Sequence, residues 1–514
     1  MTAPDQGGGA RVDAPAPAAS QDGITQPVVT GSALGWPLVA LSALQLMVVL
    51  DGTVVNLALA RIQVDLGLSD NLRSWIVTGY ALAYGGLLLL GGRIGDVVGR
   101  KRAFLAGVGL FTLASLACGL TSSAGLLLAA RVVQGMGAAI ASPTAMALIV
   151  VTFAPGKPRN QAFSVFAMMT GLGSVLGLVV GGALTQASWR WIFLINVPIG
   201  LFIVALGWKV LSATPPGARM SLDVRGAILA TGSSTLLVFG LAQGGAGLNV
   251  MVVAALLLGV LLLVGFFLSQ RTATNPVLPL SLFANSARAA VFWCLLIMGA
   301  VLMAMTVQVA LYVQEVVGYG PLQAGLAFIP FAVALGSGSA LASKLAEKYA
   351  PRWIVAGGGV VLIGGFGYAT TLGTHISYWP DLLLPILIIG AGVGVVLVPL
   401  TLAVVAGVKP QDVGPLTATS LVSQTLGGPL GLAAVTAVTE WIVRSKIGNA
   451  YDTIDRLNLT DAQRDALAAG YTGSLALCAA LALVVLVIAV VKITFTPEDI
   501  AEGKKAEKAA NDAS

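Results

Sequence analysis

Residues 36–60 read WPLVALSALQLMVVLDGTVVNLALA, a stretch in which Asp51 is the only charged side chain. An α-helix needs about 20 mainly apolar residues to cross the hydrocarbon core of a bilayer. The segment is therefore long enough to span a membrane, and it carries a carboxylate in its interior. A charge within a span is costly unless it is paired or wetted, so Asp51 is a candidate functional residue.

The composition of the whole chain agrees with this first segment. Of its 514 residues, 57% are hydrophobic and only 10% are charged, whereas soluble domains carry about 25% charged residues. So few charges cannot cover the polar surfaces of several soluble domains. Helices in lipid satisfy their own backbone groups and need no such surface, so we predict an all-α membrane protein.

Apolar segments of spanning length recur along the chain, and we count fourteen transmembrane helices. They cover residues 36–60, 72–92, 103–121, 124–151, 161–184, 191–211, 226–243, 248–270, 288–313, 321–342, 353–372, 380–405, 415–442 and 471–493. The predicted organisation has a disordered tail, a six-helix bundle, a two-helix insert with its linkers, a second six-helix bundle and another disordered tail. These parts are residues 1–32, 33–211, 212–287, 288–493 and 494–514.

The distribution of basic residues predicts the orientation of the helices. If both termini are cytoplasmic, twenty of the 28 Lys and Arg residues fall on the cytoplasmic side and seven outside, with Arg131 left within a span. Cytoplasmic loops of membrane proteins carry such an excess. We therefore expect a multi-pass protein of a bacterial inner membrane with both termini inside. The same distribution accounts for the net charge of +6 without a nucleic-acid partner.

Two segments that follow the second and tenth predicted spans show a degenerate repeat. Residues 92–102 and 343–352 align with a shift of 251 residues, and the order basic, small, acidic, small, basic recurs. In this alignment Asp96 corresponds to Glu347. The first six and last six spans would then form two pseudo-symmetric bundles around two inserted helices, an architecture typical of transporters.

Four motifs in the first half resemble the major facilitator superfamily, in its fourteen-span QacA/EmrB-type drug–proton antiporter branch. They are residues 50–58 of the first span, residues 92–102, residues 131–137, and the glycine-rich run 171–182 with the following WRWIFLINVP at 189–198. Residues 91–93, 398–402 and 427–430 make the chain most similar to mycobacterial EfpA-type efflux proteins.

The resemblance implies a proton-coupling role for Arg131, and the burial of a carboxylate suggests the same for Asp51. In a site of low dielectric constant the neutral form of a carboxylate is favoured, whereas a nearby arginine favours the ionised form. Alternating access could switch Asp51 between these environments. The alternative is a static salt bridge that only holds the first bundle together.

Three further sets of residues are candidates for gating, packing and substrate binding. In the family, the segment after the second span latches the two bundles on the cytoplasmic side. Its residues here are Gly92, Arg93, Asp96, Gly99, Arg100 and Lys101. The glycines that allow close helix packing are Gly173, Gly177, Gly181 and Gly182. The expected substrate cavity contains Asn56, Gln134, Met169, Gln308, Phe328 and Phe331. Glu315 is either a second protonation site or, as we favour, a solvated loop charge.

These features predict a transporter rather than an enzyme. We expect proton-coupled export of amphipathic drugs or antibiotics by a monomer, with the proton gradient as energy source and no cofactor. Export of a lipid or lipid-like metabolite by the same fold is the alternative. A membrane-embedded enzyme is disfavoured, because the spans lack clustered His, Asp, Glu or Cys residues. The single histidine also argues against a metal site. An ATP-driven pump would require a phosphate-binding loop, which the sequence lacks.

Overall fold

The computed structural model describes residues 35–153, 157–212, 223–244, 249–273, 276, 280–408, 410–454 and 459–502. Regular secondary structure in these ranges is helical throughout. The predicted tail at residues 1–32 lies outside them.

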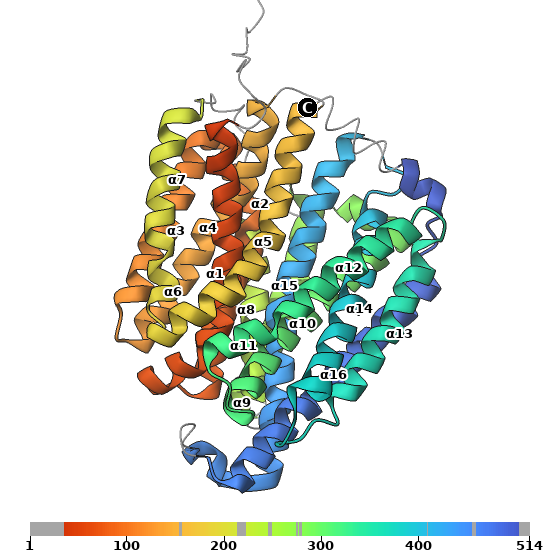
Figure 1. Ribbon diagram of the computed structural model, residues 1–514. Coiled ribbons are helices and arrows are strands. Elements are labelled where there is room, and N and C mark those ends of the chain that lie inside the picture. Colours follow the sequence, from red (N-terminus) through yellow and green to blue (C-terminus); the bar gives the residue numbers. More distant parts are fainter. Residues whose placement is uncertain are drawn as a thin grey trace, which may run out of the picture.

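The first half of the chain forms one bundle (Figure 1). Its helices are α1 (Trp36–Leu66), α2 (Asp70–Val98), α3 (Arg100–Leu120), α4 (Ala124–Thr152), α5 (Lys157–Ala187), α6 (Trp191–Leu194) and α7 (Asn196–Val210). The inserted pair is α8 (Val224–Gly244) and α9 (Val250–Thr272), and a short turn, η1 (Leu280–Phe283), leads to the second bundle. That bundle consists of α10 (Ser286–Leu311), η2 (Tyr312–Val316), α11 (Pro321–Ala327), α12 (Ile329–Leu345), α13 (Pro351–Ala369), η3 (Tyr378–Leu382), α14 (Leu383–Val404), α15 (Pro410–Ile447), η4 (Gly448–Thr453) and α16 (Asp461–Lys492).

All fourteen predicted spans coincide with helices. Within the described residues, twelve helical stretches are long and apolar enough to cross a membrane, with α6–α7, α10–η2, α11–α12 and η3–α14 each counted as one. Helices α2 and α5 occupy the two remaining predicted spans. The helix assignment thus follows the sequence-based prediction closely.

The two bundles share the same internal pairing, which supports the predicted repeat. Helix α1 packs against α5 and α7, and α10 packs likewise against α15 and α16. The pairs α2–α4 and α3–α4 recur as α12–α14 and α13–α14. Helices α8 and α9 pack mainly on each other, and α8 also contacts α2 and α15. The structure therefore consists of two helix bundles with the same pairing and an inserted helix pair.

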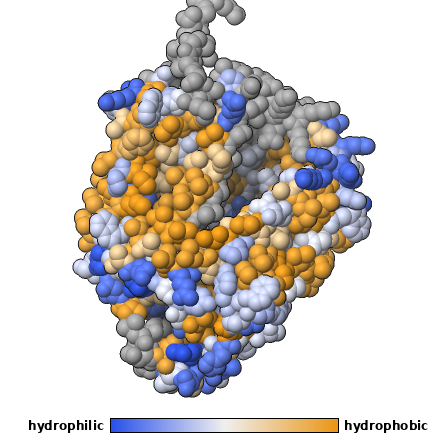
Figure 2. Space-filling model, in the orientation of Figure 1, coloured by the Kyte–Doolittle hydropathy of each residue, from blue (hydrophilic) through white to orange (hydrophobic). Residues whose placement is uncertain are grey.

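Apolar side chains cover the flank of the molecule, and polar residues gather toward its two ends (Figure 2). On α9, for example, Leu257, Leu261 and Leu268 are exposed. Apolar patches of this extent on a helical bundle mark contact with lipid. We call the end at which α1 begins and α16 ends the terminus face, and the opposite end the distal face. Figure 2 shows a recess between the two halves on the face in view.

Three predicted boundaries are wrong. The second span does not end at residue 92, because α2 continues to Val98 and only Gly99, at a φ of +99°, separates it from α3. Glycine is the residue that adopts such a positive φ without strain. The last helix begins at Asp461 rather than near 471, since Thr460 and Gln463 form a capping box there.

The predicted disordered tail at 494–514 also starts too early. Phe495 and Ile500 are buried against the second bundle. The backbone N–H of Gly407 donates to the carbonyl of Asp499. Burial of two apolar side chains orders this segment, and residues 503–514 lie outside the described part.

Candidate functional site

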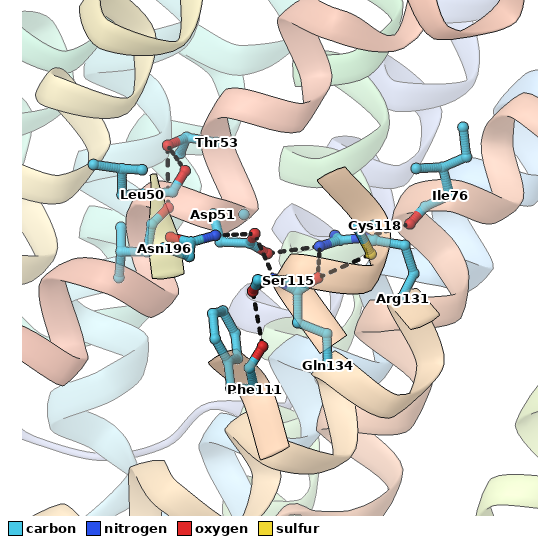
Figure 3. Close-up of polar contacts among 12 residues, drawn as sticks. Leu50, Asp51, Thr53, Ile76, Phe111, Ser115, Cys118, Arg131, Gln134 and Asn196 are labelled. Carbon is cyan, nitrogen blue, oxygen red and sulfur yellow. Dashed lines mark hydrogen bonds and ion pairs between the residues drawn. The ribbon is translucent and has the colours of Figure 1, made fainter. Parts of the chain in front are cut away.

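Asp51 and Arg131 form an ion pair in the interior of the first bundle (Figure 3). Arg131 Nη1 lies 2.7 Å from Asp51 Oδ2, and both residues are 0% exposed. Asp51 lies at the middle of α1, and Arg131 lies in the second turn of α4. The two charged residues that the sequence singled out are thus in direct contact inside the first bundle.

Two amides complete the coordination of the carboxylate. Gln134 Nε2 donates to Asp51 Oδ1 at 2.8 Å, and Asn196 Nδ2 donates to the same oxygen at 2.9 Å (Figure 3). Asn196 lies at the start of α7 and is also fully buried. An ionised carboxylate only accepts hydrogen bonds, whereas a protonated one presents a donor. Three side-chain donors around Asp51 therefore fit its ionised form, and a proton arriving there would displace one of them.

Arg131 has partners beyond Asp51. Its Nε donates to the carbonyl of Ile76 at 3.0 Å, and its Nη1 also reaches Gln134 Oε1 at 2.7 Å. The guanidinium lies 4.3 Å from the ring centroid of Tyr80, a cation–π distance. Ser115 accepts a further bond from Gln134 at 2.8 Å. These contacts tie α1, α2, α3, α4 and α7 into one polar network within the first bundle.

The network includes residues that we did not predict. Asn196 lies inside the WRWIFLINVP run, and its amide in an otherwise apolar stretch was a usable signal. Ser115 gave no such signal, since serines often bond their own helix backbone, as Ser115 does with the carbonyl of Phe111. Gln134 was placed in the substrate cavity, but this residue is fully buried and belongs to the network.

The basic residues of the predicted gating segment bind backbone carbonyls. Arg93 Nη2 donates to Pro276 O in the linker ahead of η1, and Arg100 Nη1 lies 3.4 Å from Ala147 O of α4. Lys101 Nζ donates to Trp208 O and Leu211 O at the end of α7. The segment thus ties α2 and α3 to α4, to α7 and to the linker between the bundles.

Of the acidic and glycine residues in that segment, the structure describes the surroundings of the glycines. The side chain of Asp96 lies outside the described part. A Cβ at Gly92 would lie 3.4 Å from Pro143 of α4, so this glycine lies close to that helix. Gly99 is the break between α2 and α3.

The four predicted packing glycines face two different partners. Gly173, Gly177 and Gly181 pack against α1, where a Cβ would meet Val49, Thr53 and Val54 respectively. Gly182 instead faces α11 of the other bundle, and a Cβ there would lie 2.7 Å from Leu322 Cα and from Pro321 O. Three glycines therefore hold one bundle together, and the fourth lies at the contact between bundles.

Glu315 is buried rather than solvated, which corrects our favoured expectation for this residue. It is 9% exposed, and its Oε1 lies 2.7 Å from Arg73 Nη1. Tyr471 of α16 donates its hydroxyl to Glu315 Oε2 at 2.6 Å. The sequence places Glu315 at the end of a span, where solvent is the usual partner, and only the packing of α2 and α16 over η2 buries it.

A narrow apolar cavity lies within the second bundle. It gathers three of the six predicted cavity residues, Gln308, Phe328 and Phe331. The remaining lining residues are Met305, Val309, Tyr312, Ala369, Leu372, Leu382, Pro385, Ile386, Ile389, Tyr471, Thr472 and Leu475. Asn56 and Met169 belong to the first bundle and do not line it. Asn56 Nδ2 lies 3.5 Å from the carbonyl of Gly52 on its own helix, and Met169 is half-buried on α5.

The fold and these sites define a polytopic membrane transporter. Two repeated helix bundles meet along an interface, one of them holds a fully buried ion pair, and the other holds an apolar cavity. Inverted or parallel helical repeats of this kind, with polar residues held inside the spans, are the architecture of secondary transporters.

The chain belongs to the Major Facilitator Superfamily, whose sequence profile matches residues 41–432. It is 42% identical over 478 residues to the uncharacterized MFS-type transporter EfpA of Mycobacterium tuberculosis, covering 92% of this chain and 89% of that protein. It is 37% identical to the puromycin resistance protein pur8 of Streptomyces alboniger, over 79% of this chain and 81% of the relative. It is also 36% identical to the cephamycin export protein CmcT of Amycolatopsis lactamdurans, over 76% and 82% of the two chains.

Solved structures share the fold at low sequence identity. A bacterial homologue of the human lysosomal transporter Spinster, in an inward-facing and unoccupied conformation, superposes with a TM-score of 0.66 at 17% identity. The match covers 91% of this chain and 98% of that one. The family match and the relatives above make the protein a transporter of this superfamily and not an enzyme.

Proposed function

We propose that the protein exports amphipathic antibiotics or related small molecules by alternating access, driven by the proton gradient. The observation that carries this proposal is the ion pair of Asp51 with Arg131, sealed at the middle of α1. A charged pair in this position marks an ion pathway more often than a structural contact. No bound cofactor enters the proposal.

In this proposal Asp51 is the proton-carrying group and its neighbours set its two states. The ionised state keeps the bonds to Arg131, Gln134 and Asn196. In the protonated state one acceptor position of the Asp51 carboxyl group is occupied by the proton. The side chain that can no longer donate there favours a different packing of α1, α4 and α7. Uptake and release of a proton would thereby bias the position of the first bundle.

The cargo class rests on the relatives, and the apolar lining of the cavity agrees with it. Most side chains that line the cavity in the second bundle are apolar, and they include Phe328, Phe331 and Met305. Aromatic and thioether groups form adaptable surfaces for varied apolar ligands. Relatives at 37% and 36% identity carry the names of a puromycin resistance and a cephamycin export protein.

Reconstitution into proteoliposomes tests the proposal. An imposed pH gradient should drive accumulation of some members of a panel of antibiotics, cationic dyes and fluorescent lipids, and a protonophore should abolish it. Accumulation of labelled lipids alone would assign the cargo to lipids. Accumulation that persists unchanged with the protonophore would refute proton coupling.

The proposed location is a bacterial inner membrane, with both termini cytoplasmic and a monomer as the working unit. The terminus face would then be inside and the distal face outside. A single cysteine replacing Ala462, which is exposed at the start of α16, should react with an impermeant thiol reagent on intact cells. A cysteine at Lys348, between α12 and α13, should not. The reverse pattern would invert the orientation.

A further inference from the structure

Arg73 and Glu315 form a second buried ion pair, and it joins the two bundles at the distal face. Arg73 lies in the first turn of α2, and Glu315 lies in η2 at the end of α10. Their side chains are each 4% exposed, and their charged atoms are 2.7 Å apart. Burial of a charge is tolerated when an opposite charge compensates it, and each of these two residues compensates the other.

Each member of the pair is held by its own bundle. Arg73 Nη1 also donates to Gln63 Oε1 of α1, which belongs to the first bundle. Glu315 accepts from the hydroxyl of Tyr471 of α16, which belongs to the second. If the bundles separate at the distal face, Gln63 stays with Arg73 and Tyr471 stays with Glu315. The ion pair is then the link that breaks.

Packing around the pair shows that the distal side is closed in this structure. A Cβ at Gly182 of α5 would collide with α11, as described above, and a Cβ at Gly325 of α11 would lie 2.2 Å from Leu178 O of α5. Helices of different bundles are thus in close contact at the distal side. Opening of the distal side would separate these surfaces and expose Glu315 to water.

Other charged groups at this end have partners of their own. Arg61, at the end of α1, donates to the carbonyls of Thr185 and Gln186. Asp465 near the start of α16 accepts from Thr374 and is exposed, as is its neighbour Arg464. On η2 itself, Tyr312 directs its hydroxyl to Gly373 O. Arg73 is therefore the charged group that the described contacts place against Glu315, with Tyr471 as its neutral partner.

We propose that Glu315 is a second proton-binding residue of the transport cycle, and that its ion pair with Arg73 locks the distal side. In the closed state Glu315 is ionised and paired. In the open state it meets the external solution, where a proton binds to its carboxylate and the ion pair cannot re-form until that proton leaves. Because only the open state exposes Glu315 to protonation, a lower pH shifts the population toward it.

The cavity supplies a route by which cargo could act on this lock. Tyr471 lines the apolar cavity and also donates to Glu315. A ligand that displaces the ring of Tyr471 would weaken one bond that holds the carboxylate in place. This inference deepens the proposed function, since it assigns a second residue to proton coupling within the same alternating-access cycle.

A distance measurement between spin labels on the two bundles tests the lock. Leu72 of α2 and Ala462 of α16 are exposed at the distal face, one on each bundle. Labels there should be closest at about pH 8, and a population at longer distance should grow as the pH falls toward about 5, near the usual range of a carboxylate. In Glu315→Gln, the longer distance should dominate at every pH.

Asp65→Asn is the matched control for this experiment. Asp65 pairs with Arg190 at 2.9 Å on the same face, but both residues are partly exposed and belong to the first bundle. This variant should respond to pH as the wild type does. A Glu315→Gln protein that keeps the short distance, or the wild-type pH response, would overturn the proposal. A label distance in the wild-type protein that does not change with pH would also overturn the proposal. This second test remains available if Glu315→Gln fails to fold.

The same labels separate this inference from the proposed function. Asp51→Asn should lose uphill transport, but its Arg73–Glu315 pair is intact and its distances should still respond to pH. If the label distances stop responding to pH in Asp51→Asn but still respond in Glu315→Gln, the pH sensitivity belongs to Asp51 and the lock is refuted. If Asp51→Asn still transports uphill and only Glu315→Gln loses the pH response of the distances, the proposed role of Asp51 is refuted. The proposed lock at Glu315 is then supported.

Discussion

Two buried ion pairs in the described part of this protein, Asp51–Arg131 and Arg73–Glu315, have the same length but different surroundings. Asp51–Arg131 lies within one bundle, and helices of that bundle supply every described partner of the pair. Arg73–Glu315 crosses between bundles. When rigid bundles rock against each other, contacts inside a bundle persist and contacts between bundles are exchanged. The first pair can therefore respond to a proton only by local rearrangement, whereas the second can respond by breaking.

The largest expected effect comes from the pair inside the bundle. Asp51→Asn preserves the shape of the side chain but removes its titration, so uphill transport in vesicles should be abolished while the protein still folds. Asp65→Asn makes the same change on the same helix at an exposed site and should leave transport near the wild-type level. Protonophore-sensitive pumping by Asp51→Asn would move the proton site elsewhere, with Glu315 as the next residue to examine.

Removal of the arginine should destabilise the protein much more for the buried pair Asp51–Arg131 than for the partly exposed pair Asp65–Arg190. Arg131→Ala leaves the carboxylate of Asp51 buried without its charge partner, and breaking a buried pair in this way costs about 3–5 kcal/mol. Arg190→Ala breaks a partly exposed pair, for which about 0–1 kcal/mol is typical. Thermal unfolding in detergent should show a large decrease in Tm for the first variant and a small one for the second. Similar decreases would mean that the interior of the bundle tolerates the lone carboxylate.

The glycines of α5 allow contacts within a bundle and contacts between bundles to be compared by adding a methyl group. Gly182→Ala places a methyl group against backbone atoms of α11 and should prevent full closure of the distal side. Gly173→Ala places it 3.1 Å from side-chain atoms of Val49 within the bundle, which can shift. In the Leu72–Ala462 distance measurement, Gly182→Ala should increase the long-distance population, and Gly173→Ala should leave the distribution unchanged. Equal distributions in both variants would show that Gly182 has no role in closure.

The smallest effect is expected from the tyrosine that supports the lock. Tyr471→Phe keeps the ring that lines the cavity but removes the hydroxyl bond to Glu315. A hydrogen bond to a charged group contributes about 1.5–3 kcal/mol. The variant should therefore favour the open distal side at a higher pH than the wild type does, but its distances should still depend on pH. An unchanged pH midpoint would indicate that Arg73 alone holds the carboxylate.

Much of this architecture follows from the sequence. A run of about 20 apolar residues must form a helix in lipid, because no water is available to bond its backbone groups. That constraint placed fourteen helices along the chain and marked Asp51 and Arg131 as residues that needed a partner inside the bundle. The second half of the repeat was recognisable from the pattern at 343–352 even though few of its residues are identical to those at 92–102.

The tertiary structure alone decided which polar residues meet and which are sealed from water. Asn196 and Ser115 joined the network around Asp51 because the packing of α3 and α7 brings them there, and no local pattern encodes that approach. Gly182 directly follows Gly181 in the chain yet faces the opposite bundle. Glu315 is at an apparently exposed helix end in the sequence, but it is buried against Arg73 of α2 and Tyr471 of α16, residues more than 150 positions away along the chain. Burial at an interface depends on how two bundles meet, and the order of residues within one helix does not contain that information.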